Sequence, residues 1–253
     1  MELKMHRWLI AILLLGGVAV AQEESSERSV PAFERVAATE RKEDVLPQQT
    51  VNRLHETLLK VMREGERLGY EGRYRLLEPV VQEVFDFKVI ARFSVGPFWE
   101  KLSEEQRKLL QEKLAQYATA SYAAEFKDYG GETFEIVEIK PFRRRFRTVK
   151  ALLKSPDETV AFLYLLRKVE DRWKIFDVRA DGVSDLALKR AQFTEILKKD
   201  GFEALIKRLD DKIKAYAAGK EKPELKRSAK ASKPKAGQSL ESKEREAQPS
   251  GSS

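Results

Sequence analysis

The sequence predicts an α+β fold in which helices wrap an antiparallel four-stranded sheet. Two observations lead to this prediction. Apolar residues recur at helical spacing up to about Tyr129 and again after Ser184, whereas the segment between them is rich in β-branched and aromatic residues. The strand-like runs in that segment are short and are separated by turn-forming residues such as Ser155-Pro156-Asp157, a pattern typical of a meander.

The N-terminal end of the chain has the order of parts of a secretory signal. Lys4 and Arg7 precede an apolar run from Trp8 to Val20, short for a bilayer span, which ends in the small residues Ala19-Val20-Ala21. We therefore expect residues 1–21 to be removed by cleavage after Ala21 and the mature chain to lie outside the cytosol. A retained membrane anchor is the alternative. The lack of cysteine fits an oxidising compartment in which no disulfide framework is used.

The net charge of +7 is concentrated at the C-terminal end. Residues 220–253 carry nine Lys or Arg and five Glu, whereas residues 22–219 have a net charge of only +2. The high isoelectric point is therefore weak evidence for nucleic-acid binding, and we expect no nucleic-acid partner. Residues 220–253 contain almost no large apolar side chain, which predicts a disordered basic tail. Residues 22–47, polar and containing two prolines, are interpreted as a flexible lead-in to one domain over 48–219.

Two helices are expected at the start of this domain. Apolar residues at helical spacing predict the first over Gln48–Leu68, and Gly69 and Gly72 should break it. The second is predicted over about Arg73–Phe85. Pro79 should kink or divide this helix, because proline lacks the backbone N–H that a helix interior uses.

Capping residues predict the next two helices. Asp86 is placed to cap a short helix that Gly96-Pro97 should close. Ser103 and Gln106 form a capping box, in which each side chain bonds the other residue's backbone N–H. The helix that follows is expected to run to about Tyr129, with an apolar stripe along one side.

Four strands are expected next, and the third of them is apolar on both faces. Such a strand is covered on both sides, or one of its sides faces an apolar ligand. Two amphipathic helices follow, over Asp185–Lys199 and Phe202–Ala218. The expected strands are Thr133–Ile139, Phe146–Leu153, Val160–Val169 and Trp173–Ala180.

Polar residues gather where the last strand meets the next helix. Asp177 and Asp181 would lie about 13 Å apart on an extended strand, which exceeds the spacing that hydrolysis by two carboxylates needs. Ser184 is instead well placed as a helix N-cap, and Asp185 favours the positive end of the helix dipole. We therefore interpret this segment as a structural corner, with Lys189 and Arg190 on the exposed side of the helix.

The sequence offers little material for catalysis. His55 is the sole histidine outside residues 1–21, and a lone histidine in a helix is far more often structural than catalytic. No metal-ligand spacing, phosphate loop or nucleophile motif occurs. We therefore expect no catalytic residue, no metal and no cofactor, and a protein that is not an enzyme.

Three groups of residues occur in a recognisable order along the chain. They are Gly96, Trp99, Leu102 and Gln106 at the start of the long helix; Tyr122-Ala123, Tyr129, Gly131-Glu132 and Phe134 after it; and Trp173, Asp177-Val178, Asp181-Gly182-Val183-Ser184, Arg190 and Phe193 around the corner. In their order and spacing these groups resemble the signature of the toluene-tolerance or MlaC-type family of periplasmic lipid shuttles. The resemblance covers about Thr50–Ala217.

The resemblance implies an NTF2-like cone with a deep apolar pocket for lipid acyl chains. It also implies a periplasmic carrier that shuttles phospholipid between the outer membrane and an inner-membrane ABC transporter. The implied partners are the transporter's substrate-binding component and an outer-membrane lipoprotein complex. The hopanoid-associated HpnM branch of the family also looks similar and the sequence does not separate the two, so a hopanoid ligand is an alternative.

A carrier of this kind needs an excess of inward apolar side chains. A two-chain lipid with roughly 30 methylenes would cost on the order of 20 kcal/mol to expose to water, so nearly all of its length must be enclosed. The candidate pocket residues are apolar or aromatic and lie where the long helix and the sheet should meet. Each of them is also suited to ordinary core packing. They are Tyr117, Tyr122, Phe126, Phe162, Tyr164, Leu166, Ile175 and Val178.

Two other functions stay open at this point. An enzyme on an NTF2-like cone is disfavoured by the scarcity of histidine and the lack of paired acids. An extracytoplasmic adaptor that binds only protein would differ from a carrier in keeping no lipid through purification.

Overall fold

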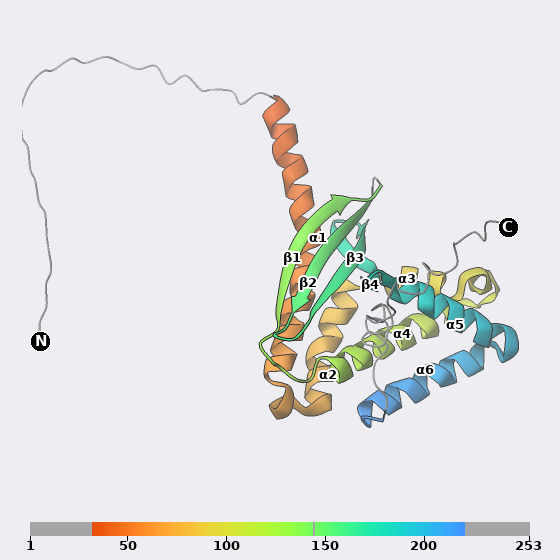
Figure 1. Ribbon diagram of the computed structural model, residues 1–253. Coiled ribbons are helices and arrows are strands. Elements are labelled where there is room, and N and C mark those ends of the chain that lie inside the picture. Colours follow the sequence, from red (N-terminus) through yellow and green to blue (C-terminus); the bar gives the residue numbers. More distant parts are fainter. Residues whose placement is uncertain (1–31, 144, 221–253) are drawn as a thin grey trace, which may run out of the picture. The chain divides into compact units, whose positions relative to one another are not determined.

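The computed structural model describes residues 32–143 and 145–220, and side chains from Pro47 onward (Figure 1). The packing below concerns the compact unit that begins at Thr39. The predicted signal, residues 1–21, and residues 221–253 of the predicted tail lie outside the described residues.

Helix α1 spans Ala32–Arg63, so it begins earlier than the sequence predicts and ends five residues before the expected Leu68. The expected flexible lead-in over 22–47 is therefore helical from Ala32, and Pro47 lies inside the helix instead of before it. Residues 32–46 are rich in Ala, Glu, Arg and Lys, which are strong helix formers, and this propensity explains the difference.

Helix α2 spans Gly65–Val84 and is interrupted where the sequence predicts, at Gly69, whose φ of 59° lies in the left-handed region. Gly72 does not break it. A Cβ at Gly72 would lie 2.9 Å from the Leu68 Cβ, so this glycine provides close packing instead. Pro79 does not divide α2 either, because the helix continues to Val84.

The predicted caps form. Asp86 accepts a hydrogen bond from the Val89 N–H at the start of α3, Phe87–Val95. The short 3₁₀ helix η1, Gly96–Lys101, follows. The Ser103–Gln106 capping box opens α4, Glu104–Glu125. This helix ends about four residues before the expected Tyr129, because Phe126 leaves helical geometry and turns its ring into the core.

The sheet has five strands, in the order β1-β2-β3-β4-β5, all antiparallel. The expected count of four is too low by one two-residue strand. Asp181 and Gly182 both have positive φ, so the chain doubles back and Val183–Ser184 pairs with the end of the preceding strand. The strands are β1 Thr133–Pro141, β2 Phe146–Lys154, β3 Thr159–Val169, β4 Arg172–Ala180 and β5 Val183–Ser184.

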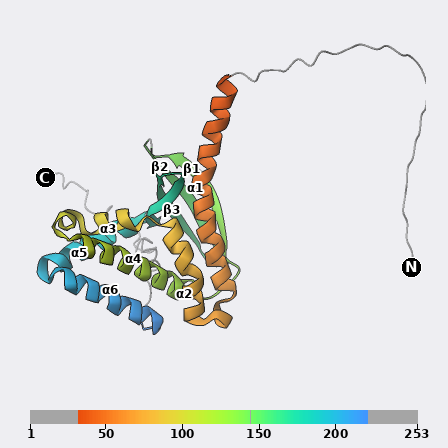
Figure 2. The same ribbon diagram turned by 180° about the vertical axis from the view of Figure 1, so that it is seen from behind.

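Helices α5, Asp185–Lys199, and α6, Gly201–Ala217, complete the fold close to their expected bounds. Two apolar clusters hold it together. The first joins the inner face of the sheet to α1, α2 and the second half of α4. The second joins α3, η1, α4, α5 and α6, which Figure 2 shows beside the sheet. The α+β prediction is confirmed.

Candidate functional site

The polar corner after β4 is a structural joint, as the sequence predicts. The Ser184 hydroxyl caps α5 by accepting from the Ala187 N–H at 3.0 Å, and it donates to the Asp177 carboxylate at 2.9 Å. Asp177 also accepts from the Leu186 N–H at 3.2 Å and lies 3.4 Å from the Arg179 Nε. The carboxylate is thus occupied in holding β4 to the start of α5.

Lys189 lies differently from its expected position. Its side chain is 11% exposed instead of lying on the outer side of α5, and it pairs with Asp185 one turn earlier. The ammonium lies 5.3 Å from the centre of the Tyr117 ring on α4. Whether one side of a helix is exposed depends on which elements pack against it, and the sequence does not give these neighbours. Here α4 covers the side of α5 that was expected to face solvent.

The first pocket lies between α3, α4, β4 and the start of α5. Together with the solvent in its mouth it has a volume of about 680 Å³. Its wall is mainly apolar and aromatic, and Asp185 and Lys189 supply its charged side chains together with Asp177. The apolar wall residues include Phe85, Phe87, Ile90, Tyr117, Tyr122 and Val178.

A second pocket lies at the other end of α4, against the turn between β2 and β3. Its volume, counted the same way, is about 910 Å³. Phe126 and Phe162 line it, with Met62 from α1 and polar residues such as Glu125 and Glu158 around them. Both pockets therefore open between the helices and the sheet.

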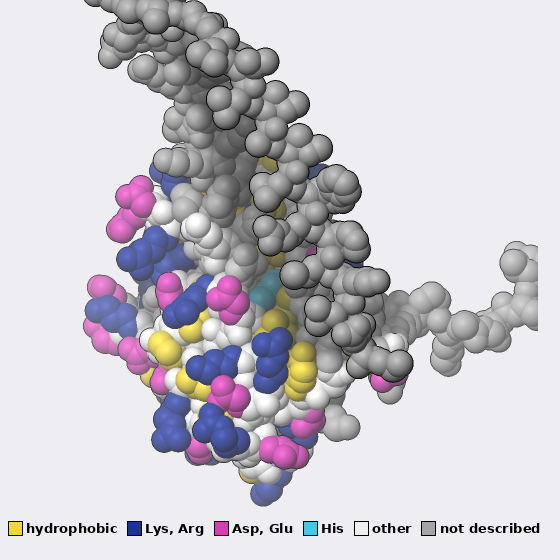
Figure 3. Space-filling view, turned by 90° about the vertical axis from the view of Figure 1, so that its left-hand side faces the viewer, with side chains coloured by type: hydrophobic (Ala, Val, Ile, Leu, Met, Phe, Trp, Pro, Cys, Tyr) yellow, Lys and Arg dark blue, Asp and Glu magenta, His cyan; other side chains and the backbone are white. Residues whose placement is uncertain are grey.

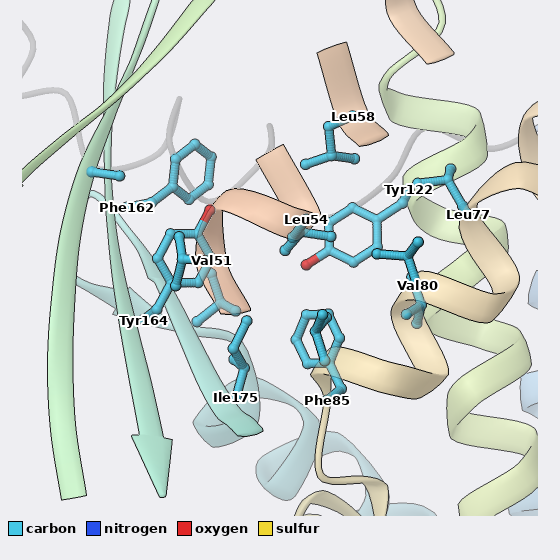
Figure 4. Close-up of a cluster of buried hydrophobic side chains, with 14 of the residues drawn as sticks. Val51, Leu54, Leu58, Leu77, Val80, Phe85, Tyr122, Phe162, Tyr164 and Ile175 are labelled. Carbon is cyan, nitrogen blue, oxygen red and sulfur yellow. The ribbon is translucent and has the colours of Figure 1, made fainter. Parts of the chain in front are cut away.

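Aromatic side chains fill the space between the two pockets. The Tyr122 ring is 6.0 Å from Phe85 and 5.8 Å from Phe126, measured between ring centres. Figure 4 shows Tyr122 reaching from α4 towards Leu54 on α1, close to the inner face of the sheet. A continuous apolar band thus connects the two openings, and side chains occupy it in this structure.

The eight candidate residues fall into three groups. Tyr117, Tyr122 and Val178 line the first pocket. Phe126 and Phe162 line the second. The remaining three, Tyr164, Leu166 and Ile175, are buried in the cluster beneath the sheet and line neither of these two pockets. Their role in binding a ligand stays a prediction.

One polar pair lies inside this apolar region. The His55 Nε2 and the Tyr164 hydroxyl are 2.9 Å apart, and the His55 ring stacks on Phe134 at 4.0 Å between ring centres. Burial lowers the pKa of His55 to about 3, so the imidazole is neutral at physiological pH. Burial also raises the pKa of the Tyr164 hydroxyl well above its usual value. One hydrogen bond therefore joins two neutral side chains inside this apolar region.

Two further observations concern the described residues. Within 32–143 and 145–220, no three His, Cys, Asp or Glu side chains gather closely enough to hold a metal ion. No helix in the described part of the chain is long and apolar enough to cross a membrane.

The family model described as MlaC protein matches residues 52–211. The chain belongs to the MlaC family. The match begins in α1, ends in α6 and so includes both pockets of this MlaC-family chain.

A solved structure has a similar fold. It is that of a phospholipid-binding protein from Ralstonia solanacearum, in complex with a phospholipid. The two chains are 20% identical with a TM-score of 0.59, and the match covers 69% of this chain and 98% of that one. No curated protein matches this MlaC-family chain.

Sequence reasoning missed several residues of the first pocket. Phe85, Phe87 and Ile90 come from the junction of α2 and α3, and Lys189 comes from α5. A parallel bridge between Phe85 and Ile175 brings that junction to β4. No local sequence pattern predicts this contact, because Phe85 and Ile175 lie 90 residues apart in the sequence.

Proposed function

We propose that this protein is an extracytoplasmic carrier of phospholipid, a binding protein and not an enzyme. One observation carries the proposal: a chain of the MlaC family has a continuous apolar band between its helices and its sheet, with an opening at each end. An apolar band of this kind suits acyl chains, because each methylene removed from water is worth about 0.8 kcal/mol.

The ligand-bound protein must differ from the structure described above. Tyr122, Phe126 and Phe162 occupy the space that an acyl chain would follow from one pocket to the other. Aromatic side chains turn about only two side-chain bonds, so a change of rotamer is the smallest movement that opens the band. Binding then exchanges contacts between side chains for contacts with methylenes, which are similar in kind.

The finer function is also a proposal. The N-terminal signal supports the periplasm as the location, and family membership supports shuttling between the outer membrane and an inner-membrane ABC transporter. The partners would be an outer-membrane lipoprotein complex and the substrate-binding component of that transporter. A hopanoid ligand is the alternative cargo within the same mechanism.

Lipid extraction from the purified protein tests the proposal. We expect phospholipid at close to one molecule per chain after purification from cells without added lipid, identified by mass spectrometry. Hopanoid in place of phospholipid would support the carrier function and identify a different ligand. An extract without lipid, from protein that also fails to take up phospholipid from vesicles, would leave a protein-binding adaptor.

A further inference from the structure

The hairpin made by β1 and β2 has a charge unlike that of the rest of the domain. From Ile139 to Lys154 the sequence contains seven Lys or Arg and no Asp or Glu. Since residues 22–219 have a net charge of +2, the remainder of that span carries −5. The whole hairpin, Thr133–Lys154, also contains Glu135 and Glu138, so it carries +5 and the rest of residues 22–219 carries −3. Basic charge is therefore concentrated in this hairpin.

Some of these cations are neutralised by neighbours and others are not. Lys140 lies 2.8 Å from Glu138, and Lys154 pairs with Glu135. Arg143, Arg145 and Lys150 are exposed, and within the described residues no carboxylate lies within ion-pair distance of them. The unneutralised charge thus lies at the turn and along the adjoining part of β2. Figure 3 shows Lys and Arg interspersed with Asp and Glu on the face that it presents.

The turn also exposes a phenylalanine. The Phe142 side chain is 45% exposed, and the Arg143 guanidinium lies 5.9 Å from the centre of its ring. The Phe142 N–H donates to the Phe146 carbonyl at 3.0 Å. This hydrogen bond closes the turn and fixes the backbone position from which the Phe142 ring extends. Figures 1 and 2 show the β1–β2 turn clear of α4 and α6. Neither core cluster includes Phe142.

We propose that the turn between β1 and β2, through Phe142, Arg143 and Arg145, docks the protein on anionic phospholipid membranes. Guanidinium groups bond lipid phosphates through two donors at once, and a single exposed aromatic ring enters the headgroup region without needing a shaped pocket. A protein partner would instead need a complementary cavity for Phe142. The inference rests on the proposed function for its purpose, because a carrier must bring its cargo to a bilayer without exposing acyl chains to water.

Binding to vesicles measures this docking. Full-length mature protein is mixed with vesicles of phosphatidylcholine containing 30% phosphatidylglycerol, or of phosphatidylcholine alone, and the bound fraction is determined by sedimentation. Each basic residue near an anionic surface is worth about a fivefold change in binding. The double variant Arg143→Gln with Arg145→Gln should therefore bind anionic vesicles about 25-fold less at low salt, and the difference should shrink as salt is added.

A matched pair of arginines controls for net charge. Arg75 and Arg208 are exposed, lie outside the hairpin, and have no ion pair among the described residues. The variant Arg75→Gln with Arg208→Gln has the same charge as the hairpin variant, and the same C-terminal segment, but should change vesicle binding less than twofold. An equal loss in both variants would overturn the proposal, because it would show attraction by net charge alone.

Tryptophan substitution at Phe142 tests whether the aromatic ring of the turn inserts into the membrane. Phe142→Trp fluorescence should shift to shorter wavelength on anionic vesicles and be quenched by lipids brominated on their acyl chains. Phe93 is 49% exposed on α3, so Phe93→Trp provides the control and should not respond. Equal responses at the two positions, or no response at Phe142→Trp, would overturn the insertion of the turn.

The outcome is separable from that for the proposed function. Lipid extracted from the hairpin variant should match the wild type, since neither arginine lines the two pockets. If no lipid can be extracted from the wild-type protein, this counts against the carrier function, whatever the result of the vesicle-binding experiment. Wild-type vesicle binding by the hairpin variant would overturn docking through the turn.

Discussion

His55 and Tyr164 share a hydrogen bond between α1 and β3, although 109 residues separate them in the sequence. The pair is enclosed by apolar side chains, and His55 is 3% exposed. A buried polar group without a partner costs about 1–3 kcal/mol, so each residue of the pair depends on the other.

This pair predicts a loss of stability in mild acid. Burial lowers the pKa of folded His55 to about 3, while the unfolded chain binds the proton near pH 6.5. The unfolded state therefore gains protons first as the pH falls, and the free energy of unfolding should decrease from pH 6.5 towards pH 3. Between pH 8 and pH 5 the decrease from this residue should be about 2 kcal/mol.

Urea denaturation of wild type and His55→Phe across this range measures the effect. Above pH 6.5 the variant should be less stable than the wild type, because the Tyr164 hydroxyl loses its partner. Its stability should depend less on pH, so the difference should narrow as the pH falls towards 5. The same slope in both proteins would show that another group is responsible.

Two tryptophan substitutions separate the pocket wall from the solid core. Val178 lines the first pocket, whereas Leu166 is fully buried and lines neither pocket. Val178→Trp should reduce copurifying lipid with little loss of stability in the lipid-free protein. Leu166→Trp should overpack the core and cost about 1–3 kcal/mol.

The comparison requires delipidated protein, because a bound ligand raises apparent stability. Melting temperature and extracted lipid are measured together for each variant. Equal destabilisation by both substitutions, with lipid retained, would mean that Val178 is ordinary core.

The corner after β4 should affect stability more than ligand binding. Ser184→Ala removes the cap of α5 and one donor to Asp177, at an expected cost of about 1 kcal/mol. Asp177→Ala should cost more, since three donors then lose their acceptor. Chemical denaturation gives both values, and uptake of lipid from vesicles by Ser184→Ala should stay near that of wild type, because Ser184 does not line the first pocket. A specific loss of uptake at full stability would reassign the corner to function.

Two glycines test a close backbone contact. A Cβ on Gly65 would lie 1.8 Å from the Lys127 carbonyl oxygen, whereas a Cβ on Gly130 would have only an ordinary contact at 3.6 Å. Gly65→Ala should therefore destabilise the protein by at least about 1–3 kcal/mol, and Gly130→Ala should change little. Thermal unfolding of the two variants provides the comparison, and equal melting temperatures would contradict the structure at this contact.

The features predicted from sequence are those that depend on near neighbours. The Asp86 cap needs a backbone group three residues away, and the Ser103–Gln106 box is equally local. The break at Gly69 follows from the freedom of glycine at positive φ. The change from helical to strand spacing after α4 predicted the sheet for the same reason.

The features that were missed depend on distant parts of the chain. The role of Gly65 depends on Lys127, and the burial of Lys189 depends on Tyr117 on another helix. The charged hairpin differs from these, because its seven basic residues are visible in the sequence. The turn that exposes Phe142 between these basic residues appears only in the structure, and the proposed docking surface depends on it.

The order of the strands bears on how the chain folds. Each strand pairs with its neighbour in the sequence, so the sheet closes only short loops, whereas the contact of Thr50 with Trp173 closes one of 123 residues. Short loops close at a lower entropic cost, and we expect the sheet to form before α1 packs on it. Until then the apolar inner face of the sheet is open to other unfolded chains. The tendency to aggregate during folding therefore depends on how fast α1 packs onto the sheet, and not only on how stable the folded protein is.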